Sequence, residues 1–518
     1  LVTGVKQQRL RRRLGLRAGA SRTVTVEYRM NPKSDQVKAA WARSARPDAA
    51  ARAFWGGLSR VSLGRRDWDH FFVSSARQLP VAASRLGCID GSIWQYNLEW
   101  LRDQAMIALG LTMIGATGPA TTVFSRLLDK FVTPEGDTLD SSVKRDPADV
   151  ELDQNGILLC TLRDYVLWTG NLDLVRRRWD KVAAAAEFPL KPVFRHPESG
   201  LLMNRREFWE RHKVHGIEPG MEMIYQGYVI HGLEAGAVLA RLTGHPEQAV
   251  RWAAEAKRLQ AAMLEDPRFR MHDERGFIKR RAPDGAVQET ITAWPEASLP
   301  KEVPLGGPGE HRINPDTSCV LPIALGLVAP DSPVAKRTFA SMERLWNQDW
   351  KHGGYGRYDV TSEPDSPGAW PFASLFVARA AAEAGDGAKV ARVLNWLGEV
   401  AGANAGTWFE FYGRRLAPPF PQVGIVVWNW AELVVLYVRH ILGVRPEENG
   451  LRIQPRLLEG VKRLDATLTF RGQRLTVKAT RKGRAKARFT ANAPVLEQTA
   501  TSVLVPYGRK AVAVTARV

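Results

Sequence analysis

The chain has 518 residues, of which 45% are hydrophobic and 25% are charged; this is ordinary globular composition and enough chain for two or three domains. No run of about 18 apolar residues occurs, so no transmembrane span is expected. The formal net charge is +19, but the basic residues are scattered and no nucleic-acid motif is present. The charge therefore indicates a basic surface or, alternatively, an acidic glycan or acidic cell surface as partner.

Residues 1–48 are expected to be the end of an N-terminal β-domain plus a linker. Polar and apolar residues alternate from Thr23 to Tyr28, which predicts a strand. We interpret this strand as the tail of a β-sandwich, followed by a polar linker and a helix near residues 49–58. No signal peptide is visible, so a cytoplasmic and an exported bacterial protein both fit the sequence.

Long helical patterns alternate with loops from about residue 67. Helices are predicted near residues 67–86, 98–115, 119–132, 155–169, 172–194, 222–243, 246–265, 315–328, 333–347, 369–384, 387–402 and 423–442. Many end at a glycine stop signal, namely Gly115, Gly170, Gly244, Gly385 and Gly443. Neighbouring helices joined by short turns form hairpins, and their periodicity fits a closed barrel or an open α-solenoid equally well.

Longer connections recur at every second helix, at residues 133–153, 195–221, 266–314, 348–367 and 403–422. Loops of this length in a compact domain are usually functional. In a barrel of hairpins they would fall on one rim, and we expect the pocket there.

Residues 444–518 are expected to form a small C-terminal β-domain. Residues alternate in polarity on both sides of Arg471-Gly472, which predicts a β-hairpin. The three cysteines, Cys88, Cys160 and Cys319, are far apart and indicate neither a disulfide framework nor a metal site. We expect no cofactor and no metal.

The segment IWQYNLEWLRDQAMIALGLTMIG combines a polar, aromatic start with an apolar helix. Its first half carries Trp94, Tyr96, Trp100, Arg102 and Asp103. Aromatic faces and a charged pair are suited to bind a sugar ring and its hydroxyl groups. Alternatively, the segment is an ordinary helix start with an Arg–Asp ion pair.

This segment resembles the "tryptophan-x-arginine-aspartate" segment of the glucoamylase-type glycoside hydrolases (glycoside hydrolase family fifteen, in the six-hairpin glycosidase superfamily). The resemblance covers roughly residues 67–442 and is strongest at 93–115, 153–182 and 410–442, whereas 266–314 resemble no family segment. It implies that residues 49–443 form a closed (α/α)6 barrel, so the expected fold is mainly α. It also implies that Arg102 and Asp103 hold the hydroxyls of the nonreducing sugar, with Trp94 and Trp100 lining it. The sequence after the barrel resembles the junction in phosphorylases and rhamnosidases of the wider group, which glucoamylase-type enzymes usually lack.

Glycosidic bond cleavage needs one carboxyl group to protonate the leaving oxygen and another to activate water. Glu210, in EFWERH, resembles the general acid of the family, and Trp209 beside it would desolvate the carboxyl group and raise its pKa. Alternatively, Glu210 pairs with Arg206 or Arg211 on a solvated loop. Glu207 is the nearest rival.

Glu410, in TWFEFYG, resembles the general base that precedes the last barrel helix of the family. Alternatively, it is a buried, hydrogen-bonded carboxylate in an aromatic cluster. Asp153, in ELDQNG, matches a family binding segment but equally fits a helix N-cap. Tyr412, Trp408 and Trp428 are plausible aromatic walls, with core packing at least as plausible.

The predicted function is that of an inverting exo-acting glycoside hydrolase, acting on α-linked glucosides or related oligosaccharides, with Glu210 as acid and Glu410 as base. The alternatives are a phosphorylase on the same barrel, an acidic-polysaccharide lyase or epimerase, and a catalytically silent glycan-binding scaffold. The expected partner is an oligosaccharide or polysaccharide, with no nucleic acid and no membrane span; the oligomeric state is not predicted.

Overall fold

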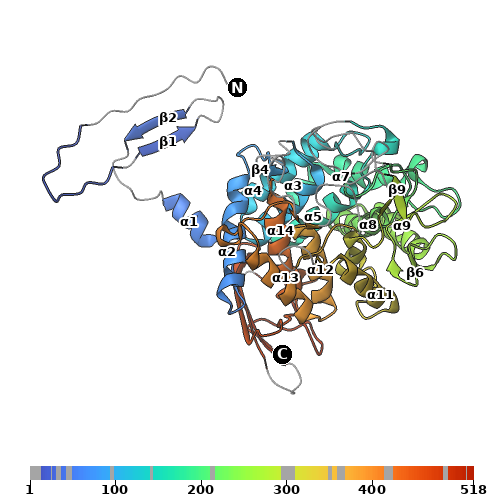
Figure 1. Cartoon of the computed structure of the whole chain (residues 1–518). Helices are drawn as coiled ribbons and strands as arrows, with labels where there is room; N and C mark the ends of the chain where they lie inside the picture. Colours follow the sequence, from blue (N-terminus) through green and yellow to red (C-terminus); the bar gives the residue numbers. More distant parts are fainter. Residues whose placement is uncertain are drawn as a thin grey trace. The chain divides into compact units, whose positions relative to one another are not determined.

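The computed structural model describes residues 13–24, 26–30, 37–41, 49–93, 98–139, 144–210, 216–292, 310–347, 353–358, 368–413, 424–481, 488–508 and 510–518. The chain divides into two compact units, Leu1–Gly57 and Leu58–Val518. In the first unit, β1 (Val26–Met30) and β2 (Val37–Trp41) pair antiparallel, and α1 (Ala49–Gly57) follows (Figure 1). The strand and the helix predicted here are therefore present, with the strand beginning at Val26.

The second unit is built around a ring of inner helices that are apolar on almost every side. These are α3 (Leu101–Met113), α5 (Asp153–Thr169), α8 (Met223–Thr243), α10 (Leu321–Ala324), α12 (Pro371–Glu383) and α14 (Val427–Val435). Nearly all their residues are buried, as expected for helices without a polar face. Each packs against the next in chain order, and α14 packs against α3 (Figure 1). The ring is closed, so the barrel prediction is confirmed and the solenoid alternative is excluded.

Outer helices cover this ring, each with one apolar stripe turned inward. They are α2 (Arg66–Ala82), α4 (Thr117–Arg126), α7 (Trp179–Glu187), α9 (Pro246–Glu265), α11 (Pro333–Met342) and α13 (Gly387–Glu399). α5 and α8 approach so closely that a Cβ on Gly156 would lie 2.1 Å from the Tyr228 carbonyl oxygen. Among the described helices, none combines the length and the apolar character needed to cross a membrane.

The segments that precede the inner helices meet at one rim. Short ladders join them there: β4 (Ser92–Ile93) pairs with β13 (Ile425–Val426), β5 (Met221–Glu222) with β8 (Arg280–Arg281), and β11 (Gly368–Ala369) with β12 (Tyr412–Gly413). The long connections predicted from the sequence all lead into inner helices. Residues far apart in the chain are thereby gathered at the N-terminal ends of the inner helices.

Two β-sheets follow the barrel. The order β18-β21-β17-β16-β3 forms a five-stranded sheet, and β14-β15-β20-β19 forms a four-stranded one. Their bounds are β3 (Arg60–Ser62), β14 (Val444–Pro446), β15 (Leu451–Ile453), β16 (Arg463–Phe470), β17 (Gln473–Thr480), β18 (Arg488–Ala491), β19 (Glu497–Gln498), β20 (Val503–Val505) and β21 (Val512–Arg517). Arg471 (φ 48°) and Gly472 (φ 70°) turn β16 into β17, so the predicted hairpin is confirmed. β3 precedes the barrel in the chain yet pairs with β16, and the sheets belong to the same compact unit as the barrel; the division at residues 48 and 443 stays a prediction.

Candidate active site

Polar side chains converge at the rim where the inner helices begin. Trp100 immediately precedes α3, Glu151 lies just before α5, and Glu222 immediately precedes α8. Helix N-termini carry a partial positive charge and favour carboxylates. The rim is therefore suited to hold ionised side chains that would otherwise be costly to bury.

Glu210 is held by two side chains that the sequence also singled out. The Trp100 indole Nε1 donates a hydrogen bond to Glu210 Oε2 at 3.1 Å, and Arg102 Nη2 donates to Oε1 at 2.5 Å. The Arg102 side chain is only 6% exposed, whereas that of Glu210 is 31% exposed. Glu210 thus presents a carboxylate that solvent or a ligand can reach, on a buried cationic support.

Glu151 is one of the residues at this site that the sequence interpretation did not single out. Its Oε2 accepts hydrogen bonds from Arg102 Nη1 at 2.8 Å and Gln154 Nε2 at 2.7 Å, and its Oε1 accepts one from Arg206 Nε at 2.5 Å. Burial opposes ionisation, but the charges of Arg206 and Arg102 outweigh it and lower the pKa of Glu151 to about 2. Glu151 therefore stays ionised and fixes both guanidinium groups. Glu151 is the first residue of the segment ELDQNG, whose resemblance to a family segment pointed to Asp153 and Gln154.

Asp103 and Asp153 complete the surroundings of Arg102. Asp103 Oδ2 lies 3.6 Å from Arg102 Nε, and Asp153 Oδ2 lies 3.7 Å from Arg102 Nη1. Asp153 is the first residue of α5 and is fully buried, while the N-cap position belongs to Leu152. The pKa of Arg102 is raised, because burial is outweighed by Glu151, Glu210 and these two aspartates. The predicted residues Arg102, Asp103 and Asp153 are therefore brought together.

Glu210 sits in an unusual backbone conformation. Its φ is +70°, in the left-handed region that residues other than glycine rarely occupy, and its N–H donates to the Glu207 carbonyl oxygen at 3.0 Å. Conformations of this kind cluster at functional sites. Arg206 Nη2 lies 3.6 Å from Glu210 Oε2, so part of the predicted alternative is also present, and Arg211 lies outside the described residues.

Five aromatic side chains, here called the aromatic belt, connect the loop of Glu210 with that of Glu410. They are Trp209, Trp370, Phe372, Phe411 and Trp428. The Trp209 and Trp370 rings are 6.5 Å apart, and Phe411 stacks on Trp370 at 5.4 Å. Phe372 lies 5.3 Å from both Trp370 and Trp428, and Trp428 lies 5.9 Å from the Arg102 guanidinium. Trp209, Trp370, Phe372 and Trp428 are buried and Phe411 is half-buried, so the belt is packed between the two loops.

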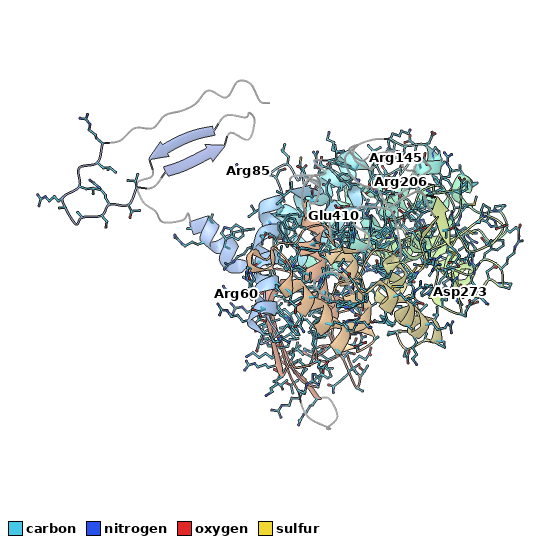
Figure 2. The ribbon with its side chains drawn as sticks, in the orientation of Figure 1. Arg60, Arg85, Arg145, Arg206, Asp273 and Glu410 are labelled. Atoms are coloured by element: carbon cyan, nitrogen blue, oxygen red, sulfur yellow. The ribbon has the colours of Figure 1, made fainter. Side chains whose placement is uncertain are left out.

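Glu410 lies on the connection between α13 and α14. It is half-buried, and its backbone N–H donates to the Gly424 carbonyl oxygen at 2.9 Å. In Figure 2, Glu410 and Arg206 both lie in the barrel unit. Because Phe411 follows Glu410 and belongs to the aromatic belt, the belt runs from one predicted carboxylate to the other.

Two predicted aromatic walls are better explained by the core-packing alternative. Trp408 is 1% exposed, and its Nε1 donates to the Leu397 carbonyl oxygen at 2.9 Å. Tyr412 is fully buried, and its hydroxyl donates to the Ala401 carbonyl oxygen at 2.5 Å. Both side chains are anchored in the barrel wall, so neither offers an exposed face to a sugar. Trp94 and Tyr96 lie outside the described residues.

A family comparison and a structural comparison locate this architecture among known proteins. The model of the glycosyl hydrolase family 65 C-terminal domain matches residues 444–493. A substituted glycosidase is similar at 17% identity with a TM-score of 0.52, over 76% of this chain and 98% of that one. A bacterial glucoamylase complexed with acarbose is similar at 17% identity with a TM-score of 0.55, over 75% and 56%. A family 78 rhamnosidase of Bacillus sp. GL1 is similar at 17% identity with a TM-score of 0.52, over 82% and 41%.

The search of curated protein sequences gave no match. The predicted resemblance to six-hairpin glycosidases is confirmed at the level of fold, while membership of the glucoamylase-type family in particular stays a prediction. The chain therefore has the (α/α)6 fold of these glycosidases, and the β structure behind its barrel is similar to the C-terminal domain of glycosyl hydrolase family 65.

Proposed function

We propose that the chain is an inverting exo-acting glycoside hydrolase for α-linked glucosides or related oligosaccharides. The observation that carries this proposal is the Glu210 carboxylate. It is partly exposed on the rim of a glycosidase-type barrel and held by Trp100 and Arg102. The aromatic belt connects its loop with that of Glu410, and the pair Arg102 and Asp103, expected to hold sugar hydroxyls, adjoins it.

In the proposed reaction Glu210 is the general acid. Arg102 lies 2.5 Å from its Oε1, and a cation at that distance favours the carboxylate form. The acid role therefore requires the hydroxyl groups of the bound sugar to take over the Arg102 donors. Glu210 is then free to carry a proton and to deliver it to the oxygen of the leaving group.

Glu410 is the general base of the proposal. It activates a water molecule that attacks the sugar carbon from the face opposite the leaving group, which inverts the anomeric centre. Such a pair leaves room for water, with the carboxyl groups roughly 6.5–9.5 Å apart. The aromatic belt, whose ring contacts run from Trp209 to Phe411, supports a location of the two glutamates on the same rim.

The test is incubation with a panel of α- and β-linked oligosaccharides, with and without phosphate, followed by proton NMR of the first product. The proposal expects phosphate-independent release of a terminal sugar whose anomeric configuration is opposite to that of the substrate. Retention of configuration would contradict the inverting mechanism, and an unsaturated product would identify a lyase.

A phosphorylase is the second candidate, and one observation favours it. Residues 444–493 match the C-terminal domain of glycosyl hydrolase family 65, which is a phosphorylase-type family. In this alternative, phosphate replaces water and attacks the sugar from the face opposite Glu210, so a cationic site is required there in place of Glu410. Formation of a sugar 1-phosphate only in the phosphate-containing arm of the panel would establish this alternative.

A further inference from the structure

The segment of residues 206–210, here called the acid loop, is fixed by side-chain contacts on both sides of Phe208. Arg206 is anchored to Glu151. Glu207 forms an ion pair with Lys279, whose Nζ lies 2.6 Å from Glu207 Oε2, and the Trp209 indole Nε1 donates a hydrogen bond to Asp316 Oδ2 at 2.8 Å. Glu210 follows these anchors directly, so its direction depends on them.

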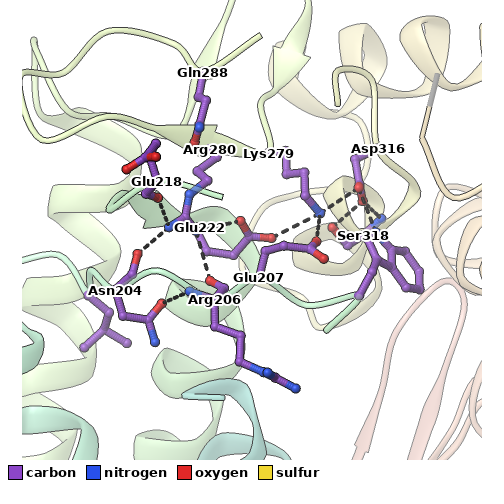
Figure 3. A network of polar contacts seen from close by, with 12 residues as sticks. Asn204, Arg206, Glu207, Glu218, Glu222, Lys279, Arg280, Gln288, Asp316 and Ser318 are labelled. Atoms are coloured by element: carbon purple, nitrogen blue, oxygen red, sulfur yellow. Dashed lines mark hydrogen bonds and ion pairs between the residues drawn. The ribbon is translucent and has the colours of Figure 1, made fainter. Parts of the chain in front are cut away.

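Lys279 connects two of these anchors. Its Nζ lies 2.6 Å from Glu207 Oε2 and 2.8 Å from Asp316 Oδ2, and Figure 3 shows it between the two carboxylates. It is also 3.3 Å from Glu222 Oε1. One buried cation thereby fixes Glu207, whose carbonyl oxygen receives the Glu210 N–H, and Asp316, which receives the Trp209 indole.

Lys279 is itself rigidly placed by its backbone. Its N–H donates to Asn314 Oδ1 at 2.8 Å, and its carbonyl oxygen accepts from the Met223 N–H at 2.8 Å, at the start of α8. The side chain is 1% exposed. The ammonium group therefore acts as a fixed point rather than as a mobile surface charge.

The buried carboxylates around Lys279 depend on its positive charge. Three buried carboxylates, Glu207, Glu222 and Asp316, face Lys279 and Arg280, and Arg280 Nη1 lies 3.3 Å from Glu222 Oε2 (Figure 3). Without the Lys279 charge, Glu207 and Asp316 would repel each other in a region that excludes water. If these two carboxylates moved apart, Glu207 would shift the start of the Phe208–Trp209 pair and Asp316 would shift the Trp209 indole. The left-handed backbone turn at Glu210, which follows directly, would then relax.

We propose that Lys279 is a positioning residue for the general acid: it holds the acid loop so that the Glu210 carboxyl group points at the leaving-group oxygen. This inference rests on the proposed function, because it assumes that Glu210 is the acid. It gives a role to the connection between α9 and α10, which resembles no family segment in sequence.

The test compares two substrates that differ in their need for acid catalysis. One is the disaccharide that the panel identifies as the best substrate, and the other is the 2,4-dinitrophenyl glycoside of the same sugar, whose leaving group departs without a proton. In Lys279→Met we expect kcat for the disaccharide to fall by ~10²-fold, the loss associated with a misplacement of about 1 Å, with KM little changed. The dinitrophenyl glycoside should lose less than about threefold, since it bypasses the acid.

Lys389→Met is the matched control, because Lys389 forms an ion pair with Glu343 on another part of the barrel and should leave both rates unchanged. The double variant Lys279→Met/Glu207→Gln removes the cation together with one carboxylate. It guards against misfolding caused by unpaired charge, and the proposal expects it to keep the selective loss on the disaccharide.

The outcomes separate this inference from the proposed function. Equal losses on both substrates, or no loss on either, in a folded Lys279→Met or double variant would overturn the positioning role alone. If Glu210→Gln keeps full disaccharide activity, or if no sugar on the panel is turned over, the proposed function fails and this inference with it. A selective loss in both Glu210→Gln and Lys279→Met supports both.

Discussion

Glu151 controls the electrostatics of the rim because it receives both Arg102 and Arg206 while fully enclosed by protein. Two guanidinium groups so close together repel each other unless an anion lies between them. A buried pair that loses one partner leaves an uncompensated charge, which costs ~3–5 kcal/mol. The integrity of the Arg102 support, and through it the Glu210 carboxylate, should therefore depend on this single side chain.

We predict that Glu151→Gln lowers the free energy of unfolding by ~3–5 kcal/mol at neutral pH. The pKa of Glu151 is about 2 in the folded state against an ordinary value of 4.5, so its contribution is present above pH 4.5 and is lost as the pH falls towards 2. Denaturant titrations at several pH values should show the difference between wild type and variant shrinking over this range. A difference that is the same at pH 7 and pH 2 would contradict the ion-pair argument.

For the two proposed catalytic carboxylates we predict that Glu210→Gln and Glu410→Gln each reduce turnover by ~10²–10⁴-fold, the usual loss for general acid–base groups. Azide should restore activity to Glu410→Gln better than to Glu210→Gln on an ordinary leaving group, because azide replaces the activated water and not the acid. The exposed Glu247 on α9 provides the control variant, Glu247→Gln. Full activity in Glu410→Gln would move the phosphorylase candidate forward.

At the scale of elements, the inner helices approach each other most closely where small residues allow it. Gly156 on α5 faces the backbone of α8, with the Tyr228 carbonyl oxygen 2.1 Å from where a Cβ would be built. Neither helix can move away freely, since each also packs against its other neighbour in the ring. The distance between α5 and α8 is therefore set by the glycine at position 156, which has no side chain.

Gly156→Ala should destabilise the fold by ~1–3 kcal/mol, as overpacking of a tight interior does. Gly118→Ala on the outer helix α4 is the comparison, because a Cβ there meets no atom within 4 Å. That substitution should leave stability unchanged or raise it by roughly 0.4–1 kcal/mol through the unfolded state. Calorimetric melting of the two variants measures both effects, and equal melting temperatures would refute the packing argument.

Many helix ends and turns could be predicted from the sequence, because the residues that determine them are close together in the chain. The stop at Gly170 is an αL cap with φ 75°, and the turn at Arg471-Gly472 lies where residue alternation placed it. The site was predictable only in part, since Trp100 and Arg102 stand two residues apart but Glu151 is 49 positions from Arg102. Trp408 and Trp370 cannot be told apart from the sequence. Only tertiary packing decides that Trp408 is anchored in the barrel wall and that Trp370 belongs to the aromatic belt.

At the scale of the whole molecule, the barrel and the C-terminal sheets are tied by buried charges. Glu383 at the end of α12 accepts a hydrogen bond from His440, within the barrel, and forms ion pairs with Arg445 and Arg456, which follow the barrel. Despite burial, hydrogen bonding to His440 and the neighbouring charges lower the pKa of Glu383. The β3–β16 pairing adds a second tie.

Deletion of residues 444–518 should therefore prevent stable folding of the barrel, because Glu383 loses two partners and β3 loses its sheet. Deletion of residues 1–57, a separate compact unit, should leave the melting temperature of the remainder nearly unchanged. Circular dichroism melting of the two truncated chains tests this contrast. A folded, cooperative chain ending at residue 443 would show that the sheets are dispensable.

The contacts that close the ring of inner helices have a consequence for folding during synthesis. β4 pairs with β13 and α3 packs against α14, so the closing contacts join segments near the two ends of the barrel sequence. During synthesis, the side of α3 that packs against α14 stays exposed until residues 425–435 leave the ribosome. The aromatic belt is likewise incomplete until Trp428 is added. A nascent chain therefore carries an open, apolar wall for most of its translation and can bind no sugar in the manner proposed until the last inner helix has closed the circle.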